Sequence, residues 1–284
     1  MRSFKFPVKW FWLPLRIGFG VFRPRRRILG GYFAGEVAAV GGNVTSFAPG
    51  EAVFGAAGLH FGAYAEYLAL PAQATLVAMP ANMRFEEAAA VPLGGLNALH
   101  FMRLAQIQAG DKVLVIGAGA SIGAHAVQIA RSLGAEVTAV DAPHKADFLR
   151  RLGARHFVDY TTQDFTRGGR SYDVILSVVA GSPYGACLRL LTPGGRYLLA
   201  NPRLSDMLRS VITGWFTDKT VRFAFARETR EELRELKEMV ERGSVVPIVD
   251  RVYPMEQAAD GHRYVEAERR LGAVVMKTVS RDDA

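Results

Sequence analysis

Three small residues, Gly117, Ala120 and Gly123, are spaced three apart in the turn that follows the apolar run of residues 113–116. That run is rich in β-branched residues and has no polar alternation, which is typical of a buried parallel strand. Apolar residues at helical spacing follow the turn, and Gly134 is placed to end that helix. A turn of small residues at a helix N-terminus lets a diphosphate approach backbone N–H groups, where the helix dipole favours it.

A second apolar strand, over residues 136–140, ends at Asp141, eighteen residues after Gly123. This is close to the offset of about 20 residues at which a carboxylate reaches the ribose hydroxyls of a dinucleotide. The strict G-x-G-x-x-G spacing is not met, because Ile122 stands where the third glycine is required. The strand, turn, helix, strand and terminal carboxylate together favour a nucleotide-binding βαβ unit over an ordinary glycine-rich turn.

The residues of this unit, and those that end later strands, are the predicted cofactor contacts. The turn should hold the diphosphate and Asp141 the adenosine ribose, while later strand ends line the crevice where open parallel sheets bind ligands. The predicted set is Gly117, Ala118, Ala120, Ser121, Ile122, Gly123, Asp141, Lys145, Val178, Val179 and Ala200.

Composition indicates a globular chain with a substantial core. Half of the 284 residues are apolar and 22% are charged, which suits one large domain or two modest ones. The single cysteine, Cys187, excludes a disulfide framework and a thiolate zinc cluster. The apolar N-terminal stretch is broken by Lys9, Pro14 and Arg16, so it is neither a signal peptide nor a spanning helix. A cytoplasmic enzyme is expected.

The net charge of +8 raises the question of an acidic partner. Residues 23–27 form the densest basic cluster, which could touch nucleic acid or an acidic membrane surface. Such runs are more often solvated loops, so neither nucleic acid nor a membrane is expected as a partner. Trp10, Phe11 and Trp12 indicate a buried or partner-facing aromatic patch.

The remaining pattern predicts a β region followed by alternating strands and helices. Closely spaced strands with Gly and Pro between them are expected over residues 33–40, 52–55, 63–70 and 76–79. A helix over residues 85–90 is expected to be interrupted at 92–95 and to resume over 97–105. The alternation then predicts a doubly wound parallel sheet, with helices over 144–152, 183–191, 228–242 and 255–268 and strands over 156–160, 173–179, 195–200, 245–252 and 272–279.

Several segments resemble medium-chain dehydrogenases/reductases, and most closely their zinc-independent quinone oxidoreductase branch. They occur in the right order, at residues 29–41, 49–55, 62–67 and 87–93, in the nucleotide turn and at 152–160. The resemblance runs from about residue 28 to 279. It implies an α/β fold in which a Rossmann domain, residues 93–244, is inserted in a GroES-like substrate domain, residues 1–92 and 245–284.

Two departures from the family pattern bear on function. Zinc-dependent members carry a histidine ligand where this chain has Gly31, so no metal is expected, and the scattered histidines 60, 100, 125, 144, 156 and 262 are expected to be surface or packing residues. The family also opens with strands that carry an Asn-Pro-x-Asp-like motif, which are not found before the glycine-rich segment. The chain is therefore interpreted either as truncated or as lacking part of the substrate pocket.

The resemblance also assigns site residues. Asn97 occupies the place where a threonine often meets the nicotinamide, and its alternative interpretation is a helix N-cap. The hydroxyls of Tyr64 and Tyr67 could donate to a substrate oxygen, although a structural role is favoured for both. Tyr160 matches a family tyrosine beside the ribose. No side chain is nominated as general acid, since in this family the proton can come from water.

The predicted activity is hydride transfer between NAD(P)H and a quinone, enone or carbonyl/alcohol substrate. Asp141 would repel a 2′-phosphate and favours NAD(H), whereas Lys145 and Tyr160 favour NADP(H); the balance favours NAD(H). The alternatives are a catalytically weak or inactive nucleotide sensor or interaction protein, and incidental RNA binding. The resemblance further implies a homodimer formed through Rossmann edge strands.

Overall fold

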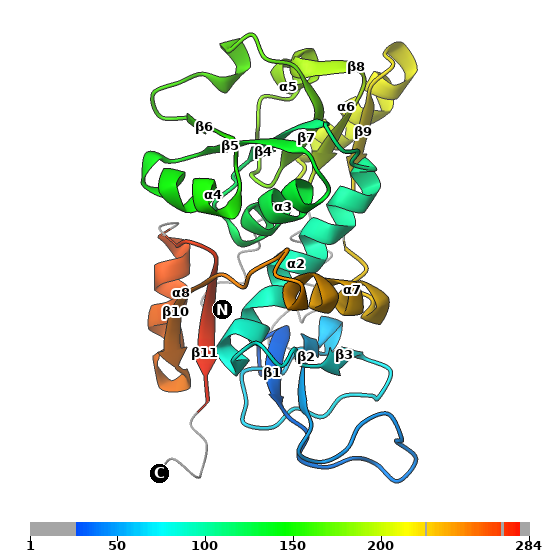
Figure 1. Cartoon of the computed structure of the whole chain (residues 1–284), viewed down its shortest axis with the longest axis vertical. Helices are drawn as coiled ribbons and strands as arrows, with labels where there is room; N and C mark the ends of the chain where they lie inside the picture. The colour runs from blue at the N-terminus through cyan, green and yellow to red at the C-terminus, as the bar shows by residue number, and fades with distance from the viewer. Residues whose placement is uncertain (1–26, 225, 268–269, 279–284) are drawn as a thin grey trace.

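The computed structural model describes residues 27–224, 226–267 and 270–278. The aromatic patch of residues 10–12 and nearly all of the basic cluster of residues 23–27 lie outside this part of the chain. Figure 1 shows a large sheet with its helices in the upper half and a smaller sheet below, with the long helix α2 (Phe85–Ala105) running obliquely between them.

The upper half is a Rossmann-type sheet of six parallel strands in the order β6-β5-β4-β7-β8-β9. The strands are β4 (Lys112–Ile116), β5 (Glu136–Asp141), β6 (His156–Asp159), β7 (Tyr172–Ser177), β8 (Leu191–Leu199) and β9 (Thr220–Phe223). Helices α3 (Ser121–Ser132) and α4 (Ala146–Leu152) cover one face, and α5 (Tyr184–Leu190) and α6 (Leu204–Phe216) lie beyond the other (Figure 1). The predicted α/β fold class is confirmed.

Alternate residues of the central strand β4 supply two separate cores. Val113 and Val115 are fully buried with α2 and α3 on one side, and Leu114 is fully buried with α5 on the other. A strand buried on both faces has no polar alternation, as the sequence predicted.

The lower half contains a three-stranded antiparallel sheet of β1 (Tyr32–Glu36), β2 (Ala52–Ala56) and β3 (Thr75–Ala78). The prediction of a further strand over residues 63–70 was wrong. The N–H groups of Gly62, Ala63 and Tyr64 donate instead to the carbonyls of Leu29 and Gly30, which holds this segment as a loop beside β1.

Helix α2 corrects a second prediction, because it runs unbroken through Pro92. Its two glycines serve close packing rather than interruption. A Cβ on Gly94 would overlap Ser121 and His125 of α3, and a Cβ on Gly95 would overlap Leu236. Contacts on both flanks hold the helix together where proline removes one backbone hydrogen bond.

After the large sheet the chain returns to the lower half through α7 (Arg230–Glu241), β10 (Val249–Pro254), α8 (Ala258–Glu266) and β11 (Ala273–Lys277). β10 and β11 pair parallel as a separate two-stranded sheet and contact α2. Short 3-10 turns occur at Gly58–His60, Pro143–Lys145, Phe165–Arg167 and Met255–Gln257. Within the described residues, no helix has the length and apolar character needed to cross a membrane.

Candidate cofactor site

Strand register brings the predicted cofactor residues to one edge of the large sheet. Ile116 pairs with Val140 of β5 and with Ser177 of β7, and Ser177 pairs with Leu199 of β8. Because parallel strands in register end together, the turn of residues 117–123, Asp141, Tyr160, Val178, Val179 and Ala200 all lie at or just beyond this edge. We call this arrangement the strand-end site.

The glycine turn is tightly built, as a diphosphate cradle requires. A Cβ on Gly123 would overlap the carbonyl of Gly117 and lie 2.7 Å from the Cα of Ala118. A Cβ on Gly117, whose φ is +79°, would lie 2.8 Å from Val178. The turn and helix α3 are therefore packed backbone to backbone, with the side chains of Val178 and Val179 against Gly117. The first N–H groups of α3 lack intrahelical acceptors. This arrangement fits an anionic diphosphate.

Asp141 is buried and already engaged by the turn. Its Oδ2 accepts from the N–H of Gly119 at 2.7 Å, and its Oδ1 accepts from the N–H of Ala142 at 2.8 Å. Lys145, also buried, places its Nζ 3.1 Å from Oδ1. A buried carboxylate needs such partners. The pair thus offers a carboxylate for ribose hydroxyls and an ammonium for a phosphate at the same point.

The other predicted contacts differ in exposure. Val178 is buried, and its carbonyl accepts from Asn201 Nδ2 at 2.7 Å. Val179 is partly exposed, and its side chain lies against Gly117. Ala200 is held beside them because its N–H donates to Ser177. Tyr160 follows β6, and its ring is largely exposed.

Asn97 lies inside α2, so the N-cap interpretation was wrong. Its Nδ2 donates to the carbonyl of Leu93 at 2.9 Å, one turn earlier in the helix. Tyr32 of β1 belongs to a neighbouring cluster of hydrogen bonds. The Tyr32 hydroxyl donates to Glu228 Oε1 at 2.6 Å. Glu228 precedes α7 and has a φ of +51°. Its carbonyl accepts from Thr75 at 2.6 Å, so this cluster ties the lower sheet to α7.

Burial, together with the neighbouring Glu228 carboxylate, raises the pKa of Tyr32 well above its ordinary value of 10.0. The phenol stays protonated in the folded chain at pH values where an unfolded tyrosine ionises. The free energy of unfolding should therefore fall as pH rises above about 10. The slope that this group contributes approaches about 1.4 kcal/mol per pH unit.

We expect Tyr32→Phe to lose less free energy of unfolding between pH 9 and 11 than the parent, because the contribution of this one tyrosine to the slope is removed. Urea unfolding at several pH values in this range measures the slope. Other buried tyrosines, such as Tyr197, whose pKa is also raised by burial, keep part of the slope. Tyr67→Phe is the matched control, because this ring is 73% exposed. An unchanged slope in Tyr32→Phe would contradict the assignment.

The two tyrosines named as possible substrate donors, for which a structural role was favoured, occupy different settings. Tyr64 is half-buried, and its ring lies 5.9 Å from that of His262 in α8; burial raises its pKa. Tyr67 is largely exposed. Neither lies on a strand, so the reasoning from strand alternation does not apply to them.

Metal-ligating side chains do not gather in the described part of the chain, where no group of three or more His, Cys, Asp or Glu residues could hold an ion. His125 sits under the nucleotide turn, with its Nδ1 2.8 Å from the Ser121 carbonyl, and burial lowers its pKa. Its position identifies it as a packing residue.

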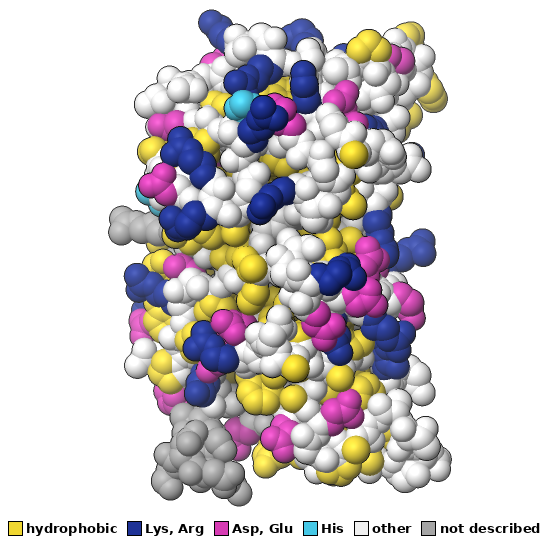
Figure 2. All heavy atoms as spheres, in the orientation of Figure 1, with side chains coloured by type: hydrophobic (Ala, Val, Ile, Leu, Met, Phe, Trp, Pro, Cys, Tyr) yellow, Lys and Arg dark blue, Asp and Glu magenta, His cyan; other side chains and the backbone are white. Residues whose placement is uncertain are grey.

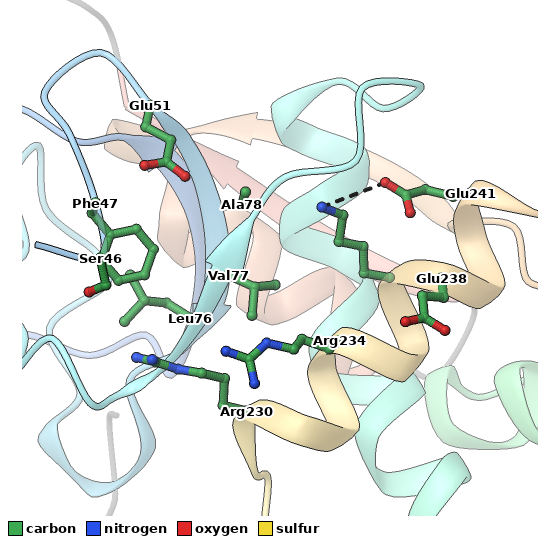
Figure 3. A pocket seen from close by; sticks show the side chains of 11 residues that line it. Ser46, Phe47, Glu51, Leu76, Val77, Ala78, Arg230, Arg234, Glu238 and Glu241 are labelled. Carbon is green, nitrogen blue, oxygen red and sulfur yellow. Dashed lines mark ion pairs between the residues drawn. The ribbon is translucent and has the colours of Figure 1, made fainter.

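A separate groove of about 410 Å³ lies between β3 and α7 (Figure 3). Its cations already have partners. Arg230 donates to the Ala72 and Ala74 carbonyls and lies over the Phe47 ring, and Lys237 pairs with Glu241 at 3.6 Å. These contacts join the lower sheet to α7 along the groove. The groove is distinct from the strand-end site.

Sequence reasoning missed two features of this region. The Asp141–Lys145 ion pair has a detectable signal, since its members are four residues apart around a helix start. The Tyr32–Glu228 bond joins residues 196 apart, and no local pattern indicates it.

A parallel six-stranded sheet with this turn and strand-end carboxylate defines a dinucleotide-binding protein. Family patterns add to this: the "Alcohol dehydrogenase GroES-like domain" matches residues 15–81, "Zinc-binding dehydrogenase" matches 152–276, and "Alanine dehydrogenase/PNT, C-terminal domain" matches 74–182.

Comparison with individual quinone oxidoreductases also indicates a dehydrogenase/reductase. The quinone oxidoreductase of Pseudomonas aeruginosa is 30% identical over 266 residues, covering 87% of this chain and 81% of that protein. The Coxiella burnetii quinone oxidoreductase structure superposes with a TM-score of 0.82 at 25% identity, covering 90% of this chain and 80% of that one. The chain belongs to the medium-chain dehydrogenase/reductase superfamily, in its quinone oxidoreductase-like branch.

Much larger proteins also contain a similar segment. The spectinabilin polyketide synthase system protein NorB of Streptomyces orinoci is 36% identical over 265 residues, covering 88% of this chain. This chain spans only 12% of the length of that protein.

The structure of CurK enoyl reductase superposes with a TM-score of 0.82 at 27% identity, covering 94% of this chain and 84% of that one.

Proposed function

We propose that the chain is an oxidoreductase that transfers hydride between NAD(P)H and a quinone, enone or carbonyl/alcohol substrate without zinc. The observation that carries the proposal is the contact between the glycine turn and the neighbouring strand tip, in which the Gly119 N–H meets the Asp141 carboxylate. Both parts of a dinucleotide site are thereby assembled in one place. The quinone oxidoreductase and enoyl reductase relatives support this substrate class.

When bound, the nicotinamide supplies the hydride, and the protein's residues bind and orient. The turn of residues 117–123 and the first amides of α3 hold the diphosphate. Asp141, Lys145 and Tyr160 surround the adenosine ribose, and Val178, Val179 and Ala200 line the crevice toward the nicotinamide. Asn97 orients the nicotinamide, and Tyr64 is the candidate donor to a substrate oxygen.

NAD(H) is the proposed cofactor. Asp141 has one oxygen beside the turn, and its negative charge opposes a 2′-phosphate. Lys145 is already paired with that carboxylate, so its attraction for a phosphate is largely cancelled.

The proposal includes a homodimer and the predicted domain limits. Strand β9 is an outer strand of the large sheet, and its free edge suits pairing with a second copy. The predicted limit at residues 92/93 falls within α2. A cytoplasmic location remains part of the proposal.

Turnover is tested by the loss of reduced-nicotinamide absorbance with a panel of quinones, enones and aldehydes. We expect turnover with NADH on at least one class. The Ala120→Asp variant, which places a carboxylate beside the diphosphate position, should lose it. Cofactor binding without any turnover would favour a nucleotide sensor, and absence of binding would contradict the proposal.

A further inference from the structure

Arg203 follows the end of β8, at the edge of the large sheet that carries the strand-end site. Its guanidinium rests on Gly181, in the loop after β7. A Cβ on Gly181 would lie 2.5 Å from Arg203 Cζ and 3.0 Å from Nε. Gly181 also has a φ of +85°, a conformation that glycine adopts readily. A side chain at position 181 would therefore strain the loop and displace the guanidinium.

The two segments that meet at this contact are fixed to each other. Asn201 Nδ2 donates to the Val178 carbonyl at 2.7 Å, which joins the residues after β8 to those after β7. The Ser177 hydroxyl lies 2.6 Å from the Ser182 hydroxyl, which closes the loop between them. The backbone that carries Arg203 is thus held in place, which lowers the entropy lost when its guanidinium binds a ligand.

The positive charge of Arg203 has no partner in the protein. Figure 2 shows Lys and Arg side chains over both halves of the molecule, many of them beside Asp or Glu, so an exposed cation alone does not mark a site. Arg203 is exposed, and no carboxylate of the described residues forms an ion pair with its guanidinium. The acid nearest in sequence, Asp206, is buried and accepts from the Arg203 backbone N–H at 3.0 Å instead. The guanidinium therefore keeps its donors for a carboxylate or a phosphate.

The order of the strands decides which ligand Arg203 meets. In the run β5-β4-β7-β8, Asp141 ends β5 and the glycine turn follows β4. Neighbouring strands lie about 4.8 Å apart, so the end of β8 is about 10 Å from the turn proposed to hold the diphosphate. A dinucleotide that runs from β5 across β4 directs its nicotinamide toward β7 and β8. Arg203 lies at this end, where a substrate must meet the nicotinamide.

We propose that Arg203 determines specificity by binding a carboxylate or phosphate group of the substrate, an inference that rests on the proposed function. The quinone, enone or carbonyl is then one part of an acidic molecule whose anionic group meets the guanidinium. A carboxylate can accept two parallel N–H bonds from arginine, which orients the ligand as well as attracting it.

A matched pair of ligands tests the proposal: 4-oxopent-2-enoate, an enone that carries a carboxylate, and its methyl ester. We expect the carboxylate to bind the complex of the full chain with NAD+ at least about tenfold more tightly than the ester, measured by calorimetry. NAD+ has no hydride to donate, so the measurement does not need turnover. Arg203→Ala should abolish this preference. Arg209→Ala is the matched control, because it removes another exposed arginine, six residues further along α6, and should leave the preference unchanged.

Titration with NADH separates the two sources of an anionic group. Arg203→Ala should bind NADH within a factor of about three of the parent. A fall in NADH affinity as large as the fall for the carboxylate would overturn the proposal in favour of a contact with the cofactor's diphosphate. Equal binding of carboxylate and ester by the parent chain would overturn it as well.

Failure of the proposed function gives a different result. In that case the chain would bind neither NAD+ nor NADH, and the two ligands would be titrated into the chain alone. A preference for the carboxylate that Arg203→Ala abolishes would still support anion binding by Arg203. Equal binding of the two ligands there would overturn it.

Discussion

Gly123→Val should abolish binding of reduced nicotinamide dinucleotides. The added side chain would run into the backbone of Gly117 and Ala118, which cannot move without opening the turn. We expect affinity to fall more than about 100-fold, equivalent to about 3 kcal/mol. The free energy of unfolding should fall by about 2–3 kcal/mol. Fluorescence titration with NADH and urea unfolding measure the two quantities.

A matched control separates this steric effect from the general effect of valine in a helix. Gly185 also lies in a helix, α5, but a Cβ there meets only Arg189, at 3.9 Å. Gly185→Val should therefore leave cofactor binding unchanged. If folded Gly123→Val bound NADH within a factor of about three of the parent, the turn could not be the diphosphate site.

Ala120→Asp tests the same turn through charge rather than through overlap with the backbone of Gly117 and Ala118. Ala120 is the N-cap of α3, with extended backbone and no side-chain cap. Aspartate caps a helix and interacts well with its dipole, so stability should rise by about 0.5–1 kcal/mol. The same carboxylate would repel a diphosphate and lower NADH affinity at least about tenfold. A gain in stability with a loss of binding is difficult to explain by misfolding.

The nucleotide unit was predictable because its signals are local. Strand β4, the glycine turn, α3 and Asp141 lie within thirty residues, and each has its own pattern of apolar spacing or small residues. The segment over residues 63–70 misled, because its mixture of aromatic and small residues is typical of a strand. Gly62, Ala63 and Tyr64 instead donate to the carbonyls of Leu29 and Gly30, which lie before β1.

Other features depend on contacts that no local pattern encodes. Pro92, Gly94 and Gly95 are ordinary helix-breaking signals, and only the packing of α2 against α3 and α7 explains the unbroken helix. No element was predicted for α6 or β9. An apolar stripe is present in α6, but its outward orientation follows from the contact between Thr213 and Tyr184.

Asp141→Ser should move cofactor preference toward NADPH by at least about 50-fold, or about 2.3 kcal/mol. Removing the carboxylate removes the repulsion of a 2′-phosphate and frees Lys145 to attract it. Because Lys145 is buried, an unpaired ammonium would also lower the free energy of unfolding by about 3 kcal/mol. Binding of NADPH should restore part of that loss, since the phosphate replaces the missing charge.

Lys145→Met and the double variant complete the comparison. Lys145→Met leaves Asp141 as an unpaired buried charge, so it should lower stability by about 3 kcal/mol and weaken NADPH binding further. The double variant should be more stable than either single variant and show little preference between the cofactors. Asp159→Ser is the control, because Asp159 ends the neighbouring strand and is held by Thr161 and Thr162 instead. If Asp159→Ser shifted preference as much as Asp141→Ser, selectivity would reflect the general field of the sheet edge rather than the buried pair.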